Sequence, residues 1–266
     1  MTARAQMLVL TALFRRDWLE AQATPWAGVS RAVSLAFAVG STHLVARAVL
    51  GAPRTDALPG GYFAWLLSGF LFADIAHAAI SGAAERLRAL QLQGGLEVDL
   101  QGPTRGVTYL LGLSLFPVTA AMVRAAAVLA VAWGALGLDV KLHLTGLACG
   151  VLGVLALWPL GLLAASVTLV VQRADPLGRI VAAAGMLGSG IAYPREVLPD
   201  WALTAAGLLP TTPALDAFRA GVLGAPFSGA DLMRLALGLG VGAALAAWVV
   251  PHAEAWARRH GRLSAD

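Results

Sequence analysis

Residues 144–171 contain no Asp, Glu, Lys or Arg, and this uncharged stretch constrains the fold more than any other feature. A helix needs about 20 apolar residues to cross a hydrocarbon core of roughly 30 Å, so the stretch is long enough to span a membrane. Elsewhere the composition fits the same environment, with 58% hydrophobic and 13% charged residues and a mean hydropathy of +0.73. Soluble domains carry about 25% charged residues, so this chain is predicted to fold within lipid.

Hydropathy predicts an all-α integral membrane fold that forms one transmembrane domain over residues 1–266. An N-terminal interfacial helix at 1–27 mixes large apolar side chains with arginines, a pattern typical of helices in the headgroup region. Prolines break the apolar sequence at 194–229 into short pieces, which favours an external re-entrant helical hairpin before the last span. The six predicted transmembrane helices are 28–50, 62–84, 106–138, 144–171, 177–193 and 231–250, with a charged cytoplasmic loop at 85–105.

The basic residues are nearly all arginines scattered between the apolar stretches, and Lys141 is the only lysine. Nucleic-acid binding needs a clustered basic face, so this distribution argues against it. With the N-terminus inside, eleven basic residues fall on the cytoplasmic side and five on the other. The positive-inside rule therefore predicts a multi-pass protein with both termini in the cytoplasm.

Ionisable residues inside spans are costly and usually functional. Asp74 and His77 are three residues apart on the second predicted span and so share a helix face, and Arg124 lies in the third. These three are candidate translocation-pathway residues or proton-relay residues. The structural alternative is a contact between helices, in which Asp74 and His77 face Arg124. A metal site is disfavoured because only two ligands are adjacent.

The chain lacks a phosphate-binding loop of the G-x-x-x-x-G-K-[ST] type, because Val140 and Leu142 flank its sole lysine. ATP-driven transport would therefore require ATP hydrolysis by a separate polypeptide. The charged loop 85–105 is the predicted docking place for it.

Two segments carry a resemblance to a known family. Residues 88–103 include Gly94, Leu96 and Glu97 and end at Gly102-Pro103, while residues 188–219 run from a glycine-rich stretch to Ala-Leu-Asp-Ala-Phe-Arg. Both resemble the membrane subunits of type-2 ABC exporters, which export drugs, lipids and polysaccharides. The chain departs from that pattern at Gly95, where the family usually has Thr, and at Leu209, where it has Asn.

The resemblance implies two permease copies, or one copy and a paralogue, each served by one ABC ATP-binding subunit in a bacterial-type inner membrane. It implies no catalytic, cofactor or metal site in this chain, because the partner subunits bind ATP and Mg²⁺. The cargo is predicted to be hydrophobic, drug-like or lipid. The residues assigned to ATPase coupling are Arg86, Arg88, Gly94, Glu97, Pro103, Arg15 and Arg16, and those assigned to the hairpin structure are Pro194, Pro199, Pro210, Asp216 and Arg219.

Two other classes remain open on the sequence. A membrane-embedded lipid-modifying enzyme could use Asp74, His77 and Arg124, although the chain has neither an H-E-x-x-H pair nor a G-x-S-x-G motif. A secondary transporter would be expected to show an internal repeat with broken helices in both halves, and a broken segment is visible only in the second half.

Overall fold

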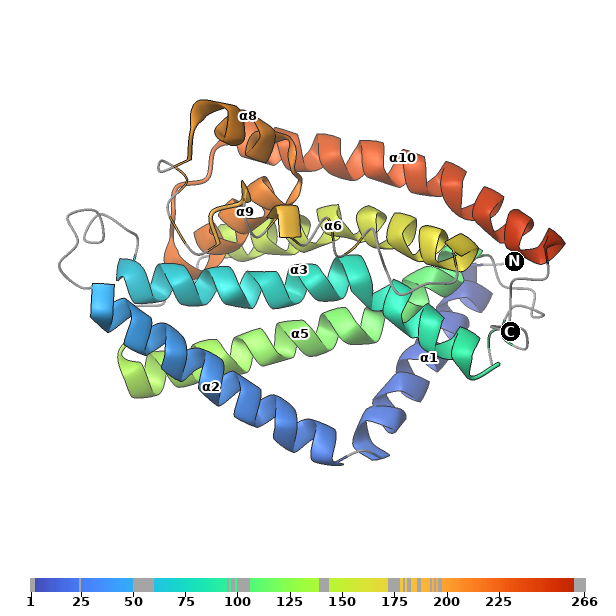
Figure 1. The fold of residues 1–266 in the computed structure, drawn as a ribbon, viewed down its shortest axis with the longest axis horizontal. Coiled ribbons are helices and arrows are strands. Elements are labelled where there is room, and N and C mark those ends of the chain that lie inside the picture. Colours follow the sequence, from blue (N-terminus) through green and yellow to red (C-terminus); the bar gives the residue numbers. More distant parts are fainter. Residues whose placement is uncertain are drawn as a thin grey trace.

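The computed structural model describes most of the chain as helix (Figure 1). Its description leaves out residues 1–2, 24, 50–59, 95, 97–98, 100–105, 139–143, 172–177, 179, 181–182, 186–187, 192, 194, 196–197 and 261–266. The described part contains no strand, in agreement with the predicted all-α fold. Its helices are α1 (Ala3–Ala23), α2 (Pro25–Val49), α3 (Gly61–Leu92), α5 (Gly106–Leu136), α6 (Leu144–Val171), α8 (Asp200–Leu208), α9 (Thr211–Leu223) and α10 (Gly229–Arg259).

Four helices are long and apolar enough to cross a membrane: α3, α5, α6 from Gly146, and α10. Their most apolar windows have mean hydropathies of 1.6 to 2.3. The first predicted span, 28–50, coincides with α2, but several residues of that helix lie outside the part of the chain in which spans could be assessed. The fifth predicted span, 177–193, is interrupted by residues outside the described part of the chain. Six spans therefore stay a prediction.

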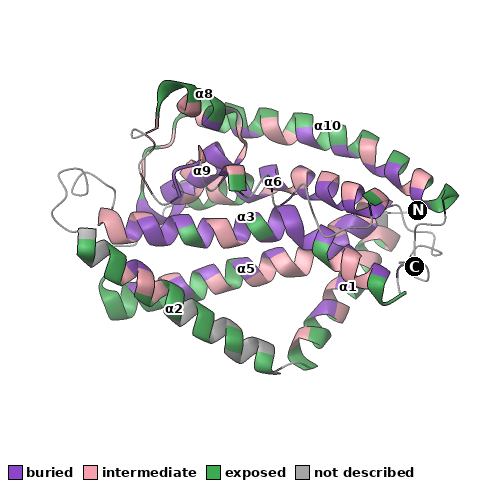
Figure 2. Cartoon of the chain, in the orientation of Figure 1, coloured by how far each residue is buried: buried purple, intermediate pink, exposed green. Residues whose placement is uncertain are grey.

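Helix α6 lies at the centre of the bundle and packs against α3, α9 and α10, while α5 packs against α3 and α1. Figure 1 shows α1 and α2 meeting at an angle, with α2 diverging from α5 along its length. Buried residues gather on α3 and α9, whereas α10 is largely exposed (Figure 2). The core is thus built around α3, α6 and α9.

Two helices extend further than predicted. Helix α3 continues to Leu92 instead of ending at residue 84, and α10 continues through Pro251 to Arg259 instead of ending at residue 250. Charged residues such as Glu85, Arg86 and Arg88 are good helix formers, so leaving the apolar stretch does not end the helix. Proline removes one intrahelical hydrogen bond, and the flanking turns keep α10 helical here.

At two helix crossings, the proline ring of one helix packs against a glycine of the other. A Cβ added at Gly82 of α3 would lie 2.9 Å from Cβ of Pro117 on α5. A Cβ added at Gly242 of α10 would likewise lie 2.9 Å from Cβ of Pro159 on α6. Both prolines lie inside helices. Because the facing glycine has no side chain, each pair of helices approaches closely at this point.

Helix α9 lies equally close to α6. A Cβ at Gly221 would lie 2.7 Å from the carbonyl oxygen of Gly146, and one at Gly146 would lie 2.6 Å from that of Ala220. The predicted hairpin region 194–229 thus contains two helices, α8 and α9, of which α9 is packed into the core.

Candidate functional site

A network of ion pairs joins α1 to the last turns of α3. Asp17 of α1 is buried, and its carboxylate accepts hydrogen bonds from Arg86 of α3, with Nη2 2.7 Å from Oδ1. Arg86 Nη2 also donates to Glu20 Oε2 at 2.6 Å, and Arg16 Nε donates to Asp17 Oδ1 at 3.3 Å. A buried carboxylate with two arginine partners satisfies the rule that buried charges must be paired. Helix α1 is therefore tied to α3 at one defined place.

Asp99 extends this network into the segment between α3 and α5. It accepts hydrogen bonds from Arg16 Nη1 at 3.0 Å and from the Tyr109 hydroxyl of α5 at 2.8 Å. Burial lowers the pKa of the Arg16 guanidinium, but the neighbouring carboxylates Asp17 and Asp99 more than offset burial and raise that pKa above its ordinary value. Arg16 therefore stays charged. Its ion pair with Asp99 joins α1 to the segment between α3 and α5.

The structure places the predicted coupling residues differently from one another. Arg16 and Arg86 make the internal ion pairs just described, whereas Arg15 is exposed. At the end of α3, Arg88 Nη1 lies 3.4 Å from Gln91 Oε1, and Gly94 turns the chain with a φ of 71°, a conformation that suits glycine. Glu97 and Pro103 lie outside the described residues.

Asp74 and Arg124 form a bidentate ion pair between α3 and α5. Arg124 Nε lies 3.1 Å from Asp74 Oδ2, and Nη2 lies 3.1 Å from Oδ1 and 2.9 Å from Oδ2. The Asp74 side chain is nevertheless 42% exposed and that of Arg124 26%. Asp74 and Arg124 thus make the contact between helices that the sequence left open as the structural alternative, and the pair is partly exposed rather than buried.

His77 does not join this pair. Its Nε2 lies 3.3 Å from Glu85 Oε1, two turns further along α3, and both side chains are about half exposed. The shared helix face of Asp74 and His77 thus leads to two different partners.

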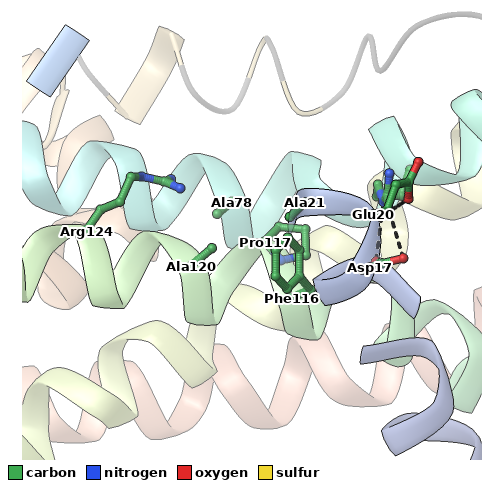
Figure 3. A pocket seen from close by; sticks show the side chains of 9 residues that line it. Asp17, Glu20, Ala21, Ala78, Phe116, Pro117, Ala120 and Arg124 are labelled. Atoms are coloured by element: carbon green, nitrogen blue, oxygen red, sulfur yellow. Dashed lines mark hydrogen bonds and ion pairs between the residues drawn. The ribbon is translucent and has the colours of Figure 1, made fainter. Parts of the chain in front are cut away.

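Arg124 lines two cavities, and Asp74 lines the second of them. One of about 400 Å³ is bounded by α1, α3 and α5; Figure 3 shows Arg124 at one end of it, Asp17 and Glu20 at the other, and Phe116 and Pro117 between them. The second, of about 440 Å³, is bounded by α2, α3 and α5 and is also lined by Asp74 and Arg124. Such volumes fall within the range of small-molecule sites, roughly 300–1,000 Å³.

Arg219 of α9 is fully buried and holds the hairpin against α3. Its guanidinium carbon lies 3.5 Å above the Trp65 ring, a cation–π contact. Nη2 donates to the carbonyl oxygens of Trp65, Gly190 and Ile191 at 3.1, 3.1 and 3.2 Å. A Cβ at Gly69 would collide with the Ile191 carbonyl, so glycine makes room for this loop. The arginine thus joins α9, α3 and the Gly190 turn.

The remaining hairpin residues stand nearby. Asp216 accepts from Arg195 Nη2 at 2.7 Å, an ion pair between α9 and the segment before α8. Pro199 and Pro210 occupy the N-cap positions of α8 and α9, where a missing N–H costs little. Pro194 lies outside the described residues. Within the described residues, no three His, Cys, Asp or Glu side chains are placed to hold a metal ion.

Comparison with known families decides the identity of this bundle. The model of the ABC-2 type transporter family matches residues 8–223. The chain belongs to this family. A search of curated proteins finds no match to the permease.

Family membership makes the chain the membrane component of an ABC transporter, a multi-pass permease whose apolar helices cross the membrane. Permeases of this family normally work with an ATP-binding subunit. The two matched ends are informative: residue 8 lies in α1 and residue 223 ends α9, so the ion-pair network and the hairpin both belong to the family's domain.

Sequence reasoning missed the acidic half of the network in the permease. Asp17 had a usable signal, because it lies four residues after Leu13 and seven after Leu10, on the apolar face of α1. A carboxylate on that face needs a buried cationic partner. Asp99 and Tyr109 gave no comparable signal, since their contacts join the α3–α5 connection to α1 and to α5.

Proposed function

We propose that this permease is the membrane subunit of an ATP-driven exporter that moves a hydrophobic drug-like or lipid substrate out of the cytoplasm by alternating access. The observation that carries the proposal is the ion-pair network joining Arg16, Asp17 and Asp99 to Arg86. It links the segment after α3, where the ATPase is proposed to dock, to two helices of the membrane domain.

The continuity of α3 gives this network a mechanical role. One helix runs from Gly61 through the Asp74–Arg124 pair to Leu92, beyond the predicted end of the apolar span. An unbroken helix transmits a displacement along its axis, because its hydrogen-bonded turns resist stretching. Pushing the segment 85–105 would then move α3 and the attached α1 together.

The proposed assembly has two ABC ATP-binding subunits, which bind ATP and Mg²⁺, and two permeases, either copies or paralogues. Support for a lipid or protein partner comes from α5 and α10, whose most apolar windows are only 28% and 22% buried. Exposed side chains there include Trp133, Val241 and Trp248. Apolar surface of that extent requires lipid or another subunit.

We further propose a bacterial-type inner membrane with both termini in the cytoplasm. The start of α1, the last turn of α3 and the last turn of α10 lie at the same end of the bundle (Figure 1). The proposed coupling segment and both termini would then face the ATPase.

Co-expression with the candidate ATP-binding subunit tests this function. The permease should copurify with that subunit and show vanadate-sensitive ATP hydrolysis in proteoliposomes. Arg88→Glu, at the end of α3, should weaken copurification, whereas Arg234→Glu, near the start of α10 at the other end of the bundle, should not. Substrate flux by the isolated permease without ATP would contradict the proposal.

A further inference from the structure

We propose that the two cavities sharing Arg124 form a binding site for a zwitterionic phospholipid, with the headgroup at the Asp74–Arg124 pair. The inference names the substrate class and, in calling that lipid a substrate, rests on the proposed export function. Its starting point is an ion pair that is complete in geometry and partly exposed, in which both partners line the cavity bounded by α2 and Arg124 also lines the cavity bounded by α1.

The ion pair has hydrogen-bonding capacity left on both partners. Arg124 directs Nε and Nη2 to Asp74, and no contact to the two N–H groups of Nη1 is found among the described residues. An ionised carboxylate has about four acceptor positions, and Asp74 uses three of them. The pair therefore keeps guanidinium donors and carboxylate acceptor capacity, and both residues line the cavity bounded by α2.

A zwitterionic headgroup matches this arrangement. A phosphate accepts from guanidinium N–H groups, and a primary ammonium donates to a carboxylate, so each end of the headgroup finds the opposite charge. The pair has no net charge, so a zwitterion adds none. An anionic lipid would bring its extra charge toward Asp74 in the cavity bounded by α2, and Asp17 and Glu20 line the far end of the other cavity.

The cavity bounded by α2 is lined by both polar and apolar side chains. The α2 wall of this cavity carries Ser30, Ser34 and Thr42, and the wall formed by α3 and α5 carries Leu67, Leu71 and Val128 beside the ion pair. Phe70, also in this wall, is 37% exposed, so acyl chains can leave toward the surrounding lipid. A charged pair bordered by apolar side chains, with hydroxyl groups in the same cavity, is what an amphipathic ligand requires.

The cavity bounded by α1 extends from Arg124 past Phe116 and Ala120 to the ion pairs of Asp17 (Figure 3). This places the proposed headgroup site in the same space as the network that links α1 to α3. A displacement of α1 would change the volume of that cavity, which would couple the site to the proposed transport cycle.

Binding to the purified permease, without ATP or an ATPase subunit, tests the site independently of export. The probes are fluorescent phosphatidylethanolamine and phosphatidylglycerol with identical acyl chains, and soluble phosphoethanolamine as a competitor that lacks them. The permease should prefer phosphatidylethanolamine, and phosphoethanolamine should displace it only weakly.

Three substitutions distinguish a headgroup site from a structural ion pair. Arg124→Gln should weaken both lipids about tenfold, the loss expected for a charge-assisted hydrogen bond. Asp74→Asn should weaken phosphatidylethanolamine but not phosphatidylglycerol, shifting the ratio of their affinities about tenfold. Ala120→Leu fills the cavity and should weaken both, whereas Ala126→Leu on the opposite face of α5, which lines a different cavity, should leave both unchanged.

Thermal melting of each variant reports whether it is folded, and the reversed pair Asp74→Arg with Arg124→Asp keeps the ion pair if single variants unfold. The reversed pair should retain the preference for phosphatidylethanolamine. An unchanged ratio of lipid affinities in Asp74→Asn, or equal effects of Ala120→Leu and Ala126→Leu, would overturn the site.

Each proposal fails in its own way. Selective lipid binding without ATP-dependent export would leave the site standing and refute the export function. ATP-dependent export together with an unchanged affinity ratio would do the reverse.

Discussion

Replacing Arg219 tests how the hairpin is held against the bundle. Arg219→Ala removes the cation–π contact with Trp65 and the donors to the carbonyls of Trp65, Gly190 and Ile191. Ser68 Oγ, 3.4 Å from Arg219 Nε, loses a weaker partner. These groups lie on α3 and in the Gly190 turn, so one substitution separates both from α9.

The magnitude follows from two opposing contributions. A desolvated cation–π contact contributes about 2 kcal/mol, and a hydrogen bond from a charged group roughly 1.5–3 kcal/mol. Burying the guanidinium costs several kcal/mol, which alanine recovers in part. Because the three carbonyls then lose a donor, we expect a net loss of about 3 kcal/mol. At roughly 2–4 °C per kcal/mol, the melting temperature should fall by about 10 °C.

The assay uses the single cysteine of the chain. Cys149 on α6 is half-buried and packs against the core, one residue from Gly150, which faces Phe218 of α9. A thiol-reactive dye in detergent therefore reports separation of α6 from α9 on heating. Arg234→Ala is the matched control, because its ion pair with Asp231 is exposed and should contribute less than about 1 kcal/mol. A melting temperature for Arg219→Ala within about 2 °C of the parent would refute the reasoning.

Three further predictions use the same chain. Asp17→Asn should cost about 2 kcal/mol in the melting assay, because it weakens the buried ion pairs, whereas Glu20→Gln at the exposed edge should cost less; equal losses would contradict the central place of Asp17. Gly221→Val should push α9 from α6 and speed dye labelling of the native protein at room temperature, and unchanged labelling would argue against the close approach. Glu97→Ala should leave membrane insertion intact but uncouple ATP hydrolysis from export, with Arg234→Ala at the other end of the bundle as control; normal export by Glu97→Ala would remove that residue from the coupling segment.

Long apolar helices were predictable from the sequence because lipid imposes one rule on every residue in them. Residues 144–171 were predicted as a helix and form α6 with the same bounds, and 106–138 forms the single helix α5. Helix ends were harder. Hydropathy reports where a chain leaves apolar surroundings, whereas the helix ends where its hydrogen bonds end, which for α3 is at Leu92.

The candidate site was predictable only in part, for a related reason. Asp74 and Arg124 stood out because charges are rare in spans, so pairing them needed only two candidates. The network around Asp17 joins residues 69 positions apart in the chain, and many charged residues flank the spans. Choosing among them required the packing of α1 on α5, which depends on the whole fold.

The two glycine–proline crossings restrict how this chain can vary over time. Gly82 has no side chain, and the ring of Pro117 fills the space that this leaves. A side chain at residue 82 would collide with that ring, so the two positions cannot vary independently. Substitutions at such a pair are epistatic: a side chain at Gly82 or Gly242 becomes tolerable once the facing proline has gone. Random mutagenesis of single positions would score these sites as invariant, whereas paired libraries would recover bundles in which the two helices are spaced differently.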